Sequence, residues 1–277
     1  MHGNFLCSYD LVYAFPRATW ERARDKASIK IGSSYLEDMN GSYRLSYSHN
    51  GIEFNATMVS VLPAWRPETG HAYFGKNRVD YFAWLVAQPS SLATASLHTT
   101  YGDSLHIGTG YHDHNWGNAP MHKNIDNWYW GRIPIDEYRV IFTDIVPQDG
   151  NNKEHLPILY ISKGDKMLAK LHDTEISKYN ITLNPTTQKP YANKISITTK
   201  DEYNSTITID IDRVSDIGFY DMSSLPYESG TYPTYIKTLN SITLTTIESN
   251  GSKTLYNGMG VVEQMSFDAE VEGITEP

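Results

Sequence analysis

Histidine and tryptophan side chains concentrate in one stretch of the chain, beside acidic residues that could exchange protons. Three of the six tryptophans lie between Trp116 and Trp130, and four of the ten histidines lie between His106 and His122. Buried polar side chains cost free energy unless a partner satisfies them or a function uses them. Core packing alone does not explain this concentration, so we take this stretch as the candidate functional site.

Two histidines of this stretch, His112 and His114, stand two residues apart. On a strand they point to one face, and Asp113 points to the other. The pattern has three interpretations: two ligands of a zinc site, an imidazole–carboxylate pair that ties two strands together, or acid–base chemistry. In the third, neighbouring indoles desolvate a His or Asp and tune its pKa towards neutrality. No third His or Glu stands at a convincing ligand spacing, so we favour acid–base chemistry and expect no metal or other cofactor.

A carboxylate follows on the next predicted strand. The segment Arg139-Val-Ile-Phe-Thr-Asp144 alternates so that Phe142 and Asp144 share a face. If burial raises the pKa of Asp144, this carboxyl group becomes a proton donor. The alternative is an ion pair with Arg132 or Arg139.

The segment Asn127-Trp-Tyr-Trp-Gly-Arg132 is either a pocket wall that ends in a cation or an aromatic cluster at a strand edge. Together these segments supply the candidate residues. The predicted catalytic residues are His112, His114 and Asp144, and the predicted substrate-binding residues are Tyr111, Asp113, Trp116, Trp128, Trp130, Arg132 and Phe142.

The elements that position these side chains are predicted to be short strands. Tyr43, Leu45 and Tyr47 alternate with polar residues, and Asn50-Gly51 supplies a hairpin turn into the next strand. Similar alternation recurs at 195–197, 207–211, 242–244 and 261–265, and Asn250-Gly251 marks another turn. This pattern predicts an all-β barrel or sandwich. One helix is predicted at Pro16–Lys26, where Pro suits a first turn. The polar loop Pro147–Glu154 predicts a boundary between domains 1–147 and 155–277.

Composition excludes some classes of partner. The formal net charge is −9 and the sequence contains no run of Lys and Arg, so nucleic acid is not expected. No apolar stretch approaches the roughly 20 residues that span a bilayer. The lone Cys7 cannot form an intrachain disulfide, which slightly favours a cytoplasmic location. Five glycosylation sequons leave secretion open, at Asn40, Asn55, Asn180, Asn204 and Asn250.

The candidate site also carries a family resemblance. Gly108-Thr-Gly-Tyr-His-Asp-His-Asn-Trp-Gly-Asn118, followed by 127–132, resembles hydroxyneurosporene synthase (carotenoid 1,2-hydratase) and its bacterial and fungal relatives. Leu156-Pro-Ile-Leu-Tyr160 resembles the opening strand of the family's second domain. Gly258-Met-Gly-Val-Val-Glu-Gln-Met265 resembles its closing strand.

This resemblance implies two consecutive lipocalin-like β domains with an apolar ligand site at or near their contact. By motif, His114 and Trp116 match the family's functional His and Trp, and Asp144 matches the Asp of its aromatic-x-Asp strand. Phe142 departs from the hydratase pattern, which has Tyr there. A phenyl ring cannot pass a proton or hold a water, and this argues against water addition.

The implied function is that of a cofactor-independent natural-product enzyme. It would fold a polyene or terpenoid in an aromatic pocket and promote a Diels–Alder-type cyclisation, with pre-organisation supplying roughly 7–11 kcal/mol in the best case. One alternative is a hydratase that protonates an alkene and stabilises the cation on aromatic faces. The other is a non-catalytic carrier of hydrophobic ligands. A hydrophobic small molecule is the expected partner in each case, and a homodimer is compatible with the sequence.

Overall fold

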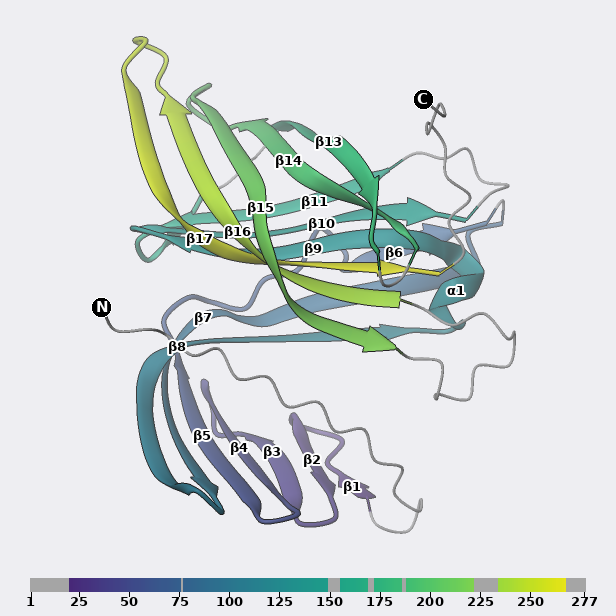
Figure 1. Ribbon diagram of the computed structural model, residues 1–277, viewed down its shortest axis with the longest axis vertical. Coiled ribbons are helices and arrows are strands. Elements are labelled where there is room, and N and C mark those ends of the chain that lie inside the picture. The colour runs from purple at the N-terminus through teal and green to yellow at the C-terminus, as the bar shows by residue number, and fades with distance from the viewer. Residues whose placement is uncertain are drawn as a thin grey trace. The chain divides into compact units, whose positions relative to one another are not determined.

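The computed structural model describes residues 20–75, 77–148, 155–168, 172–185, 188–221 and 234–267. Within these ranges the regular structure is antiparallel strand, apart from one helical turn, α1 (Met121–Asn124) (Figure 1). The predicted all-β, lipocalin-like fold is confirmed.

The first half of the chain supplies an eight-stranded sheet. Its order is β1-β2-β3-β4-β5-β7-β6, and β8 pairs with β7. The strands are β1 (Trp20–Arg22), β2 (Ser28–Ile31), β3 (Ser34–Asp38), β4 (Ser42–His49), β5 (Ile52–Ser60), β6 (His71–Phe74), β7 (Asp80–Thr99) and β8 (Gly102–Gly117).

The remaining strands form a nine-stranded sheet in the order β12-β11-β10-β9-β17-β16-β15-β14-β13. This sheet curls into a half-barrel (Figure 1). Its strands are β9 (Ile125–Ile135), β10 (Tyr138–Pro147), β11 (Leu156–Lys163), β12 (Lys166–Met167), β13 (His172–Leu183), β14 (Pro190–Lys200), β15 (Thr206–Asp221), β16 (Thr234–Ile247) and β17 (Lys253–Ser266).

The predicted hairpin between β4 and β5 is confirmed. Asn50 and Gly51 have φ of 50° and 75°. Two successive positive φ angles define a type I′ turn, whose twist matches that of the flanking strands. The register His49↔Ile52 then places Tyr47 opposite Phe54 on one face of the sheet.

The prediction of a helix at Pro16–Lys26 is wrong for those of its residues that the structure describes. Trp20–Arg22 forms β1, which pairs with Ile29–Ile31 of β2. Residues 16–19 lie outside the described residues. Pairing with β2 satisfies the backbone of β1, and that outweighs the weak helix signal of one Pro and a shared face.

The chain divides into two compact units. Within the described residues, one comprises 67–84 and 115–267, and the other comprises 20–66 and 85–114. The sequence predicts a domain boundary at 147–154, of which residues 149–154 lie outside the described residues. The flanking strands β10 and β11 pair in register from Tyr138↔Lys163 to Ile145↔Leu156. The division of the chain into domains 1–147 and 155–277 stays a prediction.

The half-barrel carries a hydrophobic core on its inner face. Isoleucines of β9, β14 and β15, including Ile133, Ile197 and Ile209, are fully buried there and pack with Val140 and Phe142 of β10. The opposite face of β9 and β10 packs against a second cluster that contains Phe74, Ile125, Ile145, Met265 and Phe267. Because both faces are covered, β10 is buried along nearly its whole length, and this accounts for its almost continuous apolar sequence.

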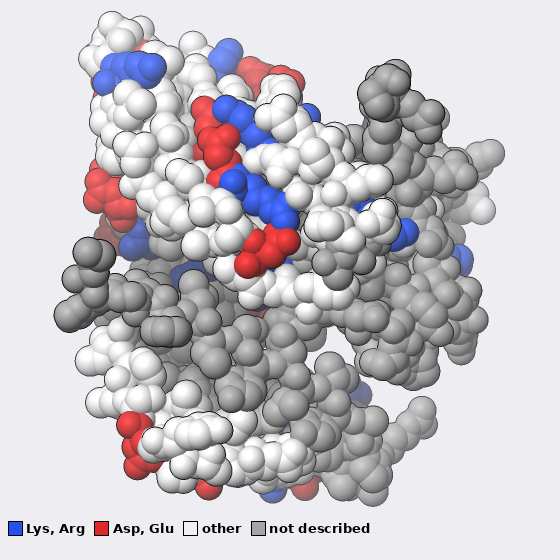
Figure 2. All heavy atoms as spheres, in the orientation of Figure 1, with Lys and Arg blue, Asp and Glu red and all other residues white. Residues whose placement is uncertain are grey.

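The outer surface of the half-barrel carries charges of both signs. Figure 2 shows Lys and Arg interspersed with Asp and Glu on the face drawn. Lys194 of β14 and Asp210 of β15 form one such pair, 3.6 Å apart, and Lys237 and Glu263 form another at 2.9 Å. In the part of the chain that the structure describes, no helix is long and apolar enough to cross a membrane.

Candidate functional site

The histidine motif lies on β8, in the unit formed by 20–66 and 85–114. His112 is half-buried, and its ring meets the edge of Tyr43 at a centroid distance of 4.4 Å. Burial lowers the pKa of His112, although the charge of Asp113 opposes this. The imidazole is therefore neutral at pH 7 and able to accept a proton.

The neighbours of His112 differ in exposure. His114 is exposed, whereas Tyr111 is half-buried and donates a hydrogen bond from its hydroxyl to Asp113 Oδ2 at 2.9 Å. Among the described residues, no group of three His, Cys, Asp or Glu side chains gathers as a metal site would require. The arrangement supplies one desolvated imidazole and one hydrogen-bonded carboxylate.

The predicted tryptophans lie in the other unit. On β9, strand alternation directs Trp128 and Trp130 away from the face that carries Asp144. Trp128 packs in the second hydrophobic cluster, with ring centroids 6.3 Å from Phe82 and 6.1 Å from Phe267. Trp130 and Arg132 share this face of β9 by their even spacing. Trp116 meets His71 edge-on at 6.1 Å.

Phe142 and Asp144 occupy the inner face of the half-barrel, as their predicted shared face requires. Phe142 is fully buried and lies over Gly131, the directly opposite residue on β9. A Cβ at position 131 would overlap the Phe142 ring. The glycine in the aromatic segment 127–132 is thus needed for core packing.

Asp144 is the centre of a buried charged cluster. Its side chain is 0% exposed, and its Oδ2 lies 2.5 Å from Lys178 Nζ and 3.0 Å from His155 Nδ1. Lys178 Nζ is 3.1 Å from the same His155 nitrogen and 5.2 Å from the centroid of the Tyr129 ring. Asp144 Oδ1 is buried and has no hydrogen-bond partner among the described residues.

The proton-donor interpretation of Asp144 requires a raised pKa, and this condition is not met. Burial by itself would raise the pKa, but the hydrogen bond from His155 and the charge of Lys178 outweigh it, and the pKa is lowered. The partners are also not the predicted arginines. Arg132 stands on the opposite face of β9, and Arg139 donates to the carbonyls of Asp136 and Tyr138. Asp144 is therefore an ionised acceptor at neutral pH.

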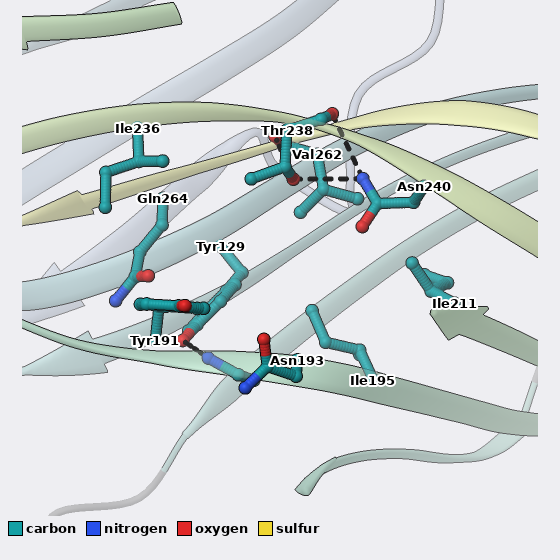
Figure 3. A pocket seen from close by; sticks show the side chains of 11 residues that line it. Tyr129, Tyr191, Asn193, Ile195, Ile211, Ile236, Thr238, Asn240, Val262 and Gln264 are labelled. Carbon is teal, nitrogen blue, oxygen red and sulfur yellow. Dashed lines mark hydrogen bonds between the residues drawn. The ribbon is translucent and has the colours of Figure 1, made fainter. Parts of the chain in front are cut away.

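The inner face also contains a small cavity (Figure 3). Its volume of about 20 Å³ is enough for one water molecule. Tyr129 lines the cavity and stands directly opposite both Asp144 of β10 and Gln264 of β17. Asp144, Tyr129 and Gln264 thus form a polar row across three strands of the inner face.

Sequence reasoning missed four residues of this region: Tyr129, His155, Lys178 and Gln264. A signal existed for Lys178, because it continues the inward alternation of Ile176 on β13. Tyr129 sat inside a recognised aromatic segment. Pairing of distant strands brings these residues together, and the spacing within any single strand does not reveal that.

The fold and this buried row define a lipocalin-like β protein. Residues 65–188, which include every predicted site residue as well as His155 and Lys178, match the family model described as carotenoid hydratase CrtC. This match confirms the resemblance drawn from the sequence.

Curated relatives match over parts of the chain. The quinolone epoxide rearrangement protein asqO of Emericella nidulans is 26% identical over 141 residues, which are 50% of this chain and 38% of that protein. The quinolone epoxide rearrangement protein penF of Penicillium thymicola is 33% identical over 79 residues, 28% of this chain and 21% of that protein. A hydroxyneurosporene dehydrogenase of Chlorobaculum tepidum is 68% identical over 25 residues, which are 9% of this chain and 6% of that protein. The chain thus spans less than two fifths of the length of these relatives.

Solved structures share the fold at low sequence identity. CghA in complex with Sch210972 superposes with a TM-score of 0.65 at 9% identity, covering 89% of this chain and 73% of that chain. A putative AttH from Nitrosomonas europaea gives 0.62 at 15% identity, with 92% and 74% covered. Kievitone hydratase from Nectria haematococca gives 0.57 at 16% identity, with 88% and 71% covered.

Proposed function

We propose that this chain acts as a cofactor-independent enzyme that binds an apolar polyene or terpenoid and promotes its cyclisation. The observation that carries the proposal is the cluster that buried Asp144 forms with Lys178 and the partly exposed His155, on the inner face of an aliphatic and aromatic half-barrel. Two comparisons support the proposal. Part of the chain matches the carotenoid hydratase family model, and part is similar to proteins named for rearranging a quinolone epoxide.

A buried ion pair is weak evidence for stability alone, because desolvation offsets much of the Coulombic attraction. Perturbed ionisable groups on an apolar wall are instead typical of sites that move protons or stabilise developing charge. Lys178 has three N–H donors, and Asp144 and His155 do not use all of them. The ammonium group can therefore stabilise negative charge that develops on a substrate oxygen.

The role of Asp144 in this proposal differs from the proton donor predicted from sequence. As an ionised carboxylate it holds Lys178 in place and contacts His155, whose side chain is 46% exposed. The predicted roles of His112 and His114 as acid or base stay part of the proposal. That Trp116, Trp128 and Trp130 contact the substrate stays a prediction, and Trp128 and Trp130 lie on the face of β9 opposite to Asp144.

Hydration of an isoprenoid double bond is the second candidate. The family match favours it, and so does one feature of the inner face. Phe142 lacks the phenol of the hydratase pattern, but Tyr129 places a hydroxyl directly opposite Asp144 on the neighbouring strand. A phenol is thus available in this region to bind water or pass a proton.

Product analysis tests both candidates. The chain is incubated with a panel of linear polyenes and terpenoids in water enriched in ¹⁸O, and products are identified by mass spectrometry. Cyclisation predicts an isomer of the substrate without ¹⁸O, and hydration predicts gain of one labelled oxygen. Binding without turnover would instead indicate a carrier and overturn the enzyme proposal.

Variants tie the reaction to the cluster. Removing an electrostatic donor typically costs about 10²–10³ in rate, so we expect Lys178→Met to lose turnover by that factor. Asp144→Asn and His114→Ala are tested beside it. Lys194→Met is the matched control, because Lys194 forms an ion pair on the outer surface. Turnover by all three site variants at the wild-type rate would remove these residues from the mechanism.

A further inference from the structure

Gln264 carries a buried acceptor whose orientation is fixed by its neighbours. The residue is 7% exposed, and its amide Nε2 donates to the carbonyl of Pro190 at 2.7 Å and to Ser266 Oγ at 3.2 Å. A carbonyl can only accept a hydrogen bond, so the amide nitrogen must face Pro190. The other amide atom, Oε1, is then the one left buried without a hydrogen-bond partner among the described residues.

Tyr129 carries a buried donor at the same cavity. Its hydroxyl oxygen accepts a hydrogen bond from the Ala192 N–H at 3.0 Å, and this leaves the hydroxyl hydrogen available to donate. Burial raises the pKa of Tyr129 well above its ordinary value, so the phenol keeps its proton at physiological pH. Tyr129 and Gln264 stand directly opposite one another on β9 and β17, and both line the cavity (Figure 3).

Two other amides, Asn193 and Asn240, also line the cavity. Asn193 donates its Nδ2 hydrogens to the carbonyl of Asn180 and to Thr182 Oγ1. Asn240 donates its Nδ2 hydrogens within its own strand, to the carbonyl and the Oγ1 of Thr238. The remaining walls include aliphatic side chains such as Ile195 and Val262. At this cavity Tyr129 therefore offers a donor and Gln264 offers an acceptor without a hydrogen-bond partner among the described residues.

We infer that the cavity between Tyr129 and Gln264 is a binding subsite for a single O–H group, which accepts a hydrogen bond from the Tyr129 hydroxyl and donates one to Gln264 Oε1. A volume of about 20 Å³ admits one water-sized group and excludes the body of a polyene. Leaving a buried acceptor unsatisfied is costly, and an O–H group removes that cost.

The O–H group has two sources, a water molecule or a hydroxyl of the ligand. A bound water suits a hydratase, and a ligand hydroxyl suits binding of an oxygenated terpenoid. The subsite therefore deepens the proposed function, and the choice between these two sources rests on that function. The subsite itself is tested without turnover, so its failure is distinguishable from failure of the proposed reaction.

The test is a high-resolution crystal structure of the chain alone and after soaking with farnesol, a linear terpenoid alcohol. An ordered water within hydrogen-bond distance of Tyr129 Oη and Gln264 Oε1 supports the inference with water as the source. A farnesol oxygen at that position supports it with the ligand as the source. No oxygen at that position in either crystal overturns it.

Variants separate this subsite from general packing. Tyr129→Phe and Gln264→Met are expected to lose the bound oxygen, and Tyr160→Phe is expected to keep it. Tyr160 is the matched control because it is a buried tyrosine that does not line this cavity. If farnesol supplies the group, its Kd rises about tenfold in Tyr129→Phe, whereas the Kd of farnesene, which lacks the hydroxyl, does not change. An unchanged oxygen in both site variants contradicts the inference.

Discussion

At the residue scale, the carboxylate of Asp144 and the ammonium of Lys178 both contact the same ring nitrogen of His155. His155 Nδ1 lies near both Asp144 Oδ2 and Lys178 Nζ. A ring nitrogen can donate to the carboxylate or accept from the ammonium, but it cannot do both at once. Movement of one proton on His155 therefore changes which partner it binds, and this couples the imidazole to the charge of the pair.

The ion pair of this cluster gives the first prediction. Lys178→Met leaves the carboxylate of Asp144 buried without its cation, and breaking a buried pair from one side costs about 3–5 kcal/mol of unfolding free energy. Urea denaturation measures this loss. Lys194→Met, which breaks a surface pair, should cost no more than about 1 kcal/mol. Equal losses in the two variants would contradict the special role of the buried pair.

The pH dependence of stability gives the second prediction. The folded-state pKa of Asp144 lies below its ordinary value of 3.8. Its ionisation therefore contributes stability that is present above the unfolded pKa and is lost as pH falls through the folded pKa. We expect the stability difference between wild type and Asp144→Asn to be largest near pH 7 and to shrink below about pH 4. Urea denaturation at pH 7, 5, 4 and 3 tests this, and a difference that is constant with pH would argue against an ionised Asp144.

At the element scale, β9 and β10 form the sheet region on which the candidate residues depend. Their register places Phe142 over Gly131 and Asp144 beside Tyr129. The alternation of β9 then directs Trp128 to the second hydrophobic cluster and Tyr129 to the inner face. The strand β9 thus contributes Trp128 to an aromatic packing surface on one face and Tyr129 to the polar row on the other.

The contact between Gly131 and Phe142 gives the third prediction. Gly131→Ala places a methyl group into the Phe142 ring, and overpacking of this kind costs typically 1–3 kcal/mol. Gly108→Ala is the matched control, since a Cβ there meets no atom within 4 Å. Thermal and urea denaturation compare the two. A second change, Phe142→Leu, should recover part of the loss in Gly131→Ala by making room.

At the scale of the whole molecule, chain segments far apart in sequence form one compact unit. Residues 67–84 join 115–267 in it. Phe74 of β6 is 3% exposed and packs in the cluster that also contains Ile145 and Phe267. The unit that holds the candidate Asp144 site therefore requires a segment from much earlier in the chain.

That long-range packing gives the fourth prediction. Phe74→Ala removes a large buried side chain and should cost about 3–5 kcal/mol. Tyr101→Ala, at a side chain that is 94% exposed, should change stability by less than about 0.5 kcal/mol. Chemical denaturation with tryptophan fluorescence as the probe measures both. A small effect of Phe74→Ala would show that 67–84 does not contribute to this core.

The sequence by itself determined the local structure. Alternation of apolar and polar residues identified β4, β14, β15 and β16, and Asn50-Gly51 identified a hairpin turn, because strand period and turn chemistry depend on neighbouring residues. The motif from Gly108 to Asn118 also carried the resemblance to carotenoid hydratases, which the family-model match over residues 65–188 bears out. The shared face of Phe142 and Asp144 followed from the same period.

Only the tertiary structure decided which residues meet. Lys178 and Asp144 are 34 positions apart, and Gln264 lies opposite Tyr129 through the pairing of β17 with β9. The pKa of Asp144 depends on these partners, so burial alone predicted its direction wrongly. Strand order and register are set by the packing of the whole sheet, and they brought together a polar row that no local spacing contains.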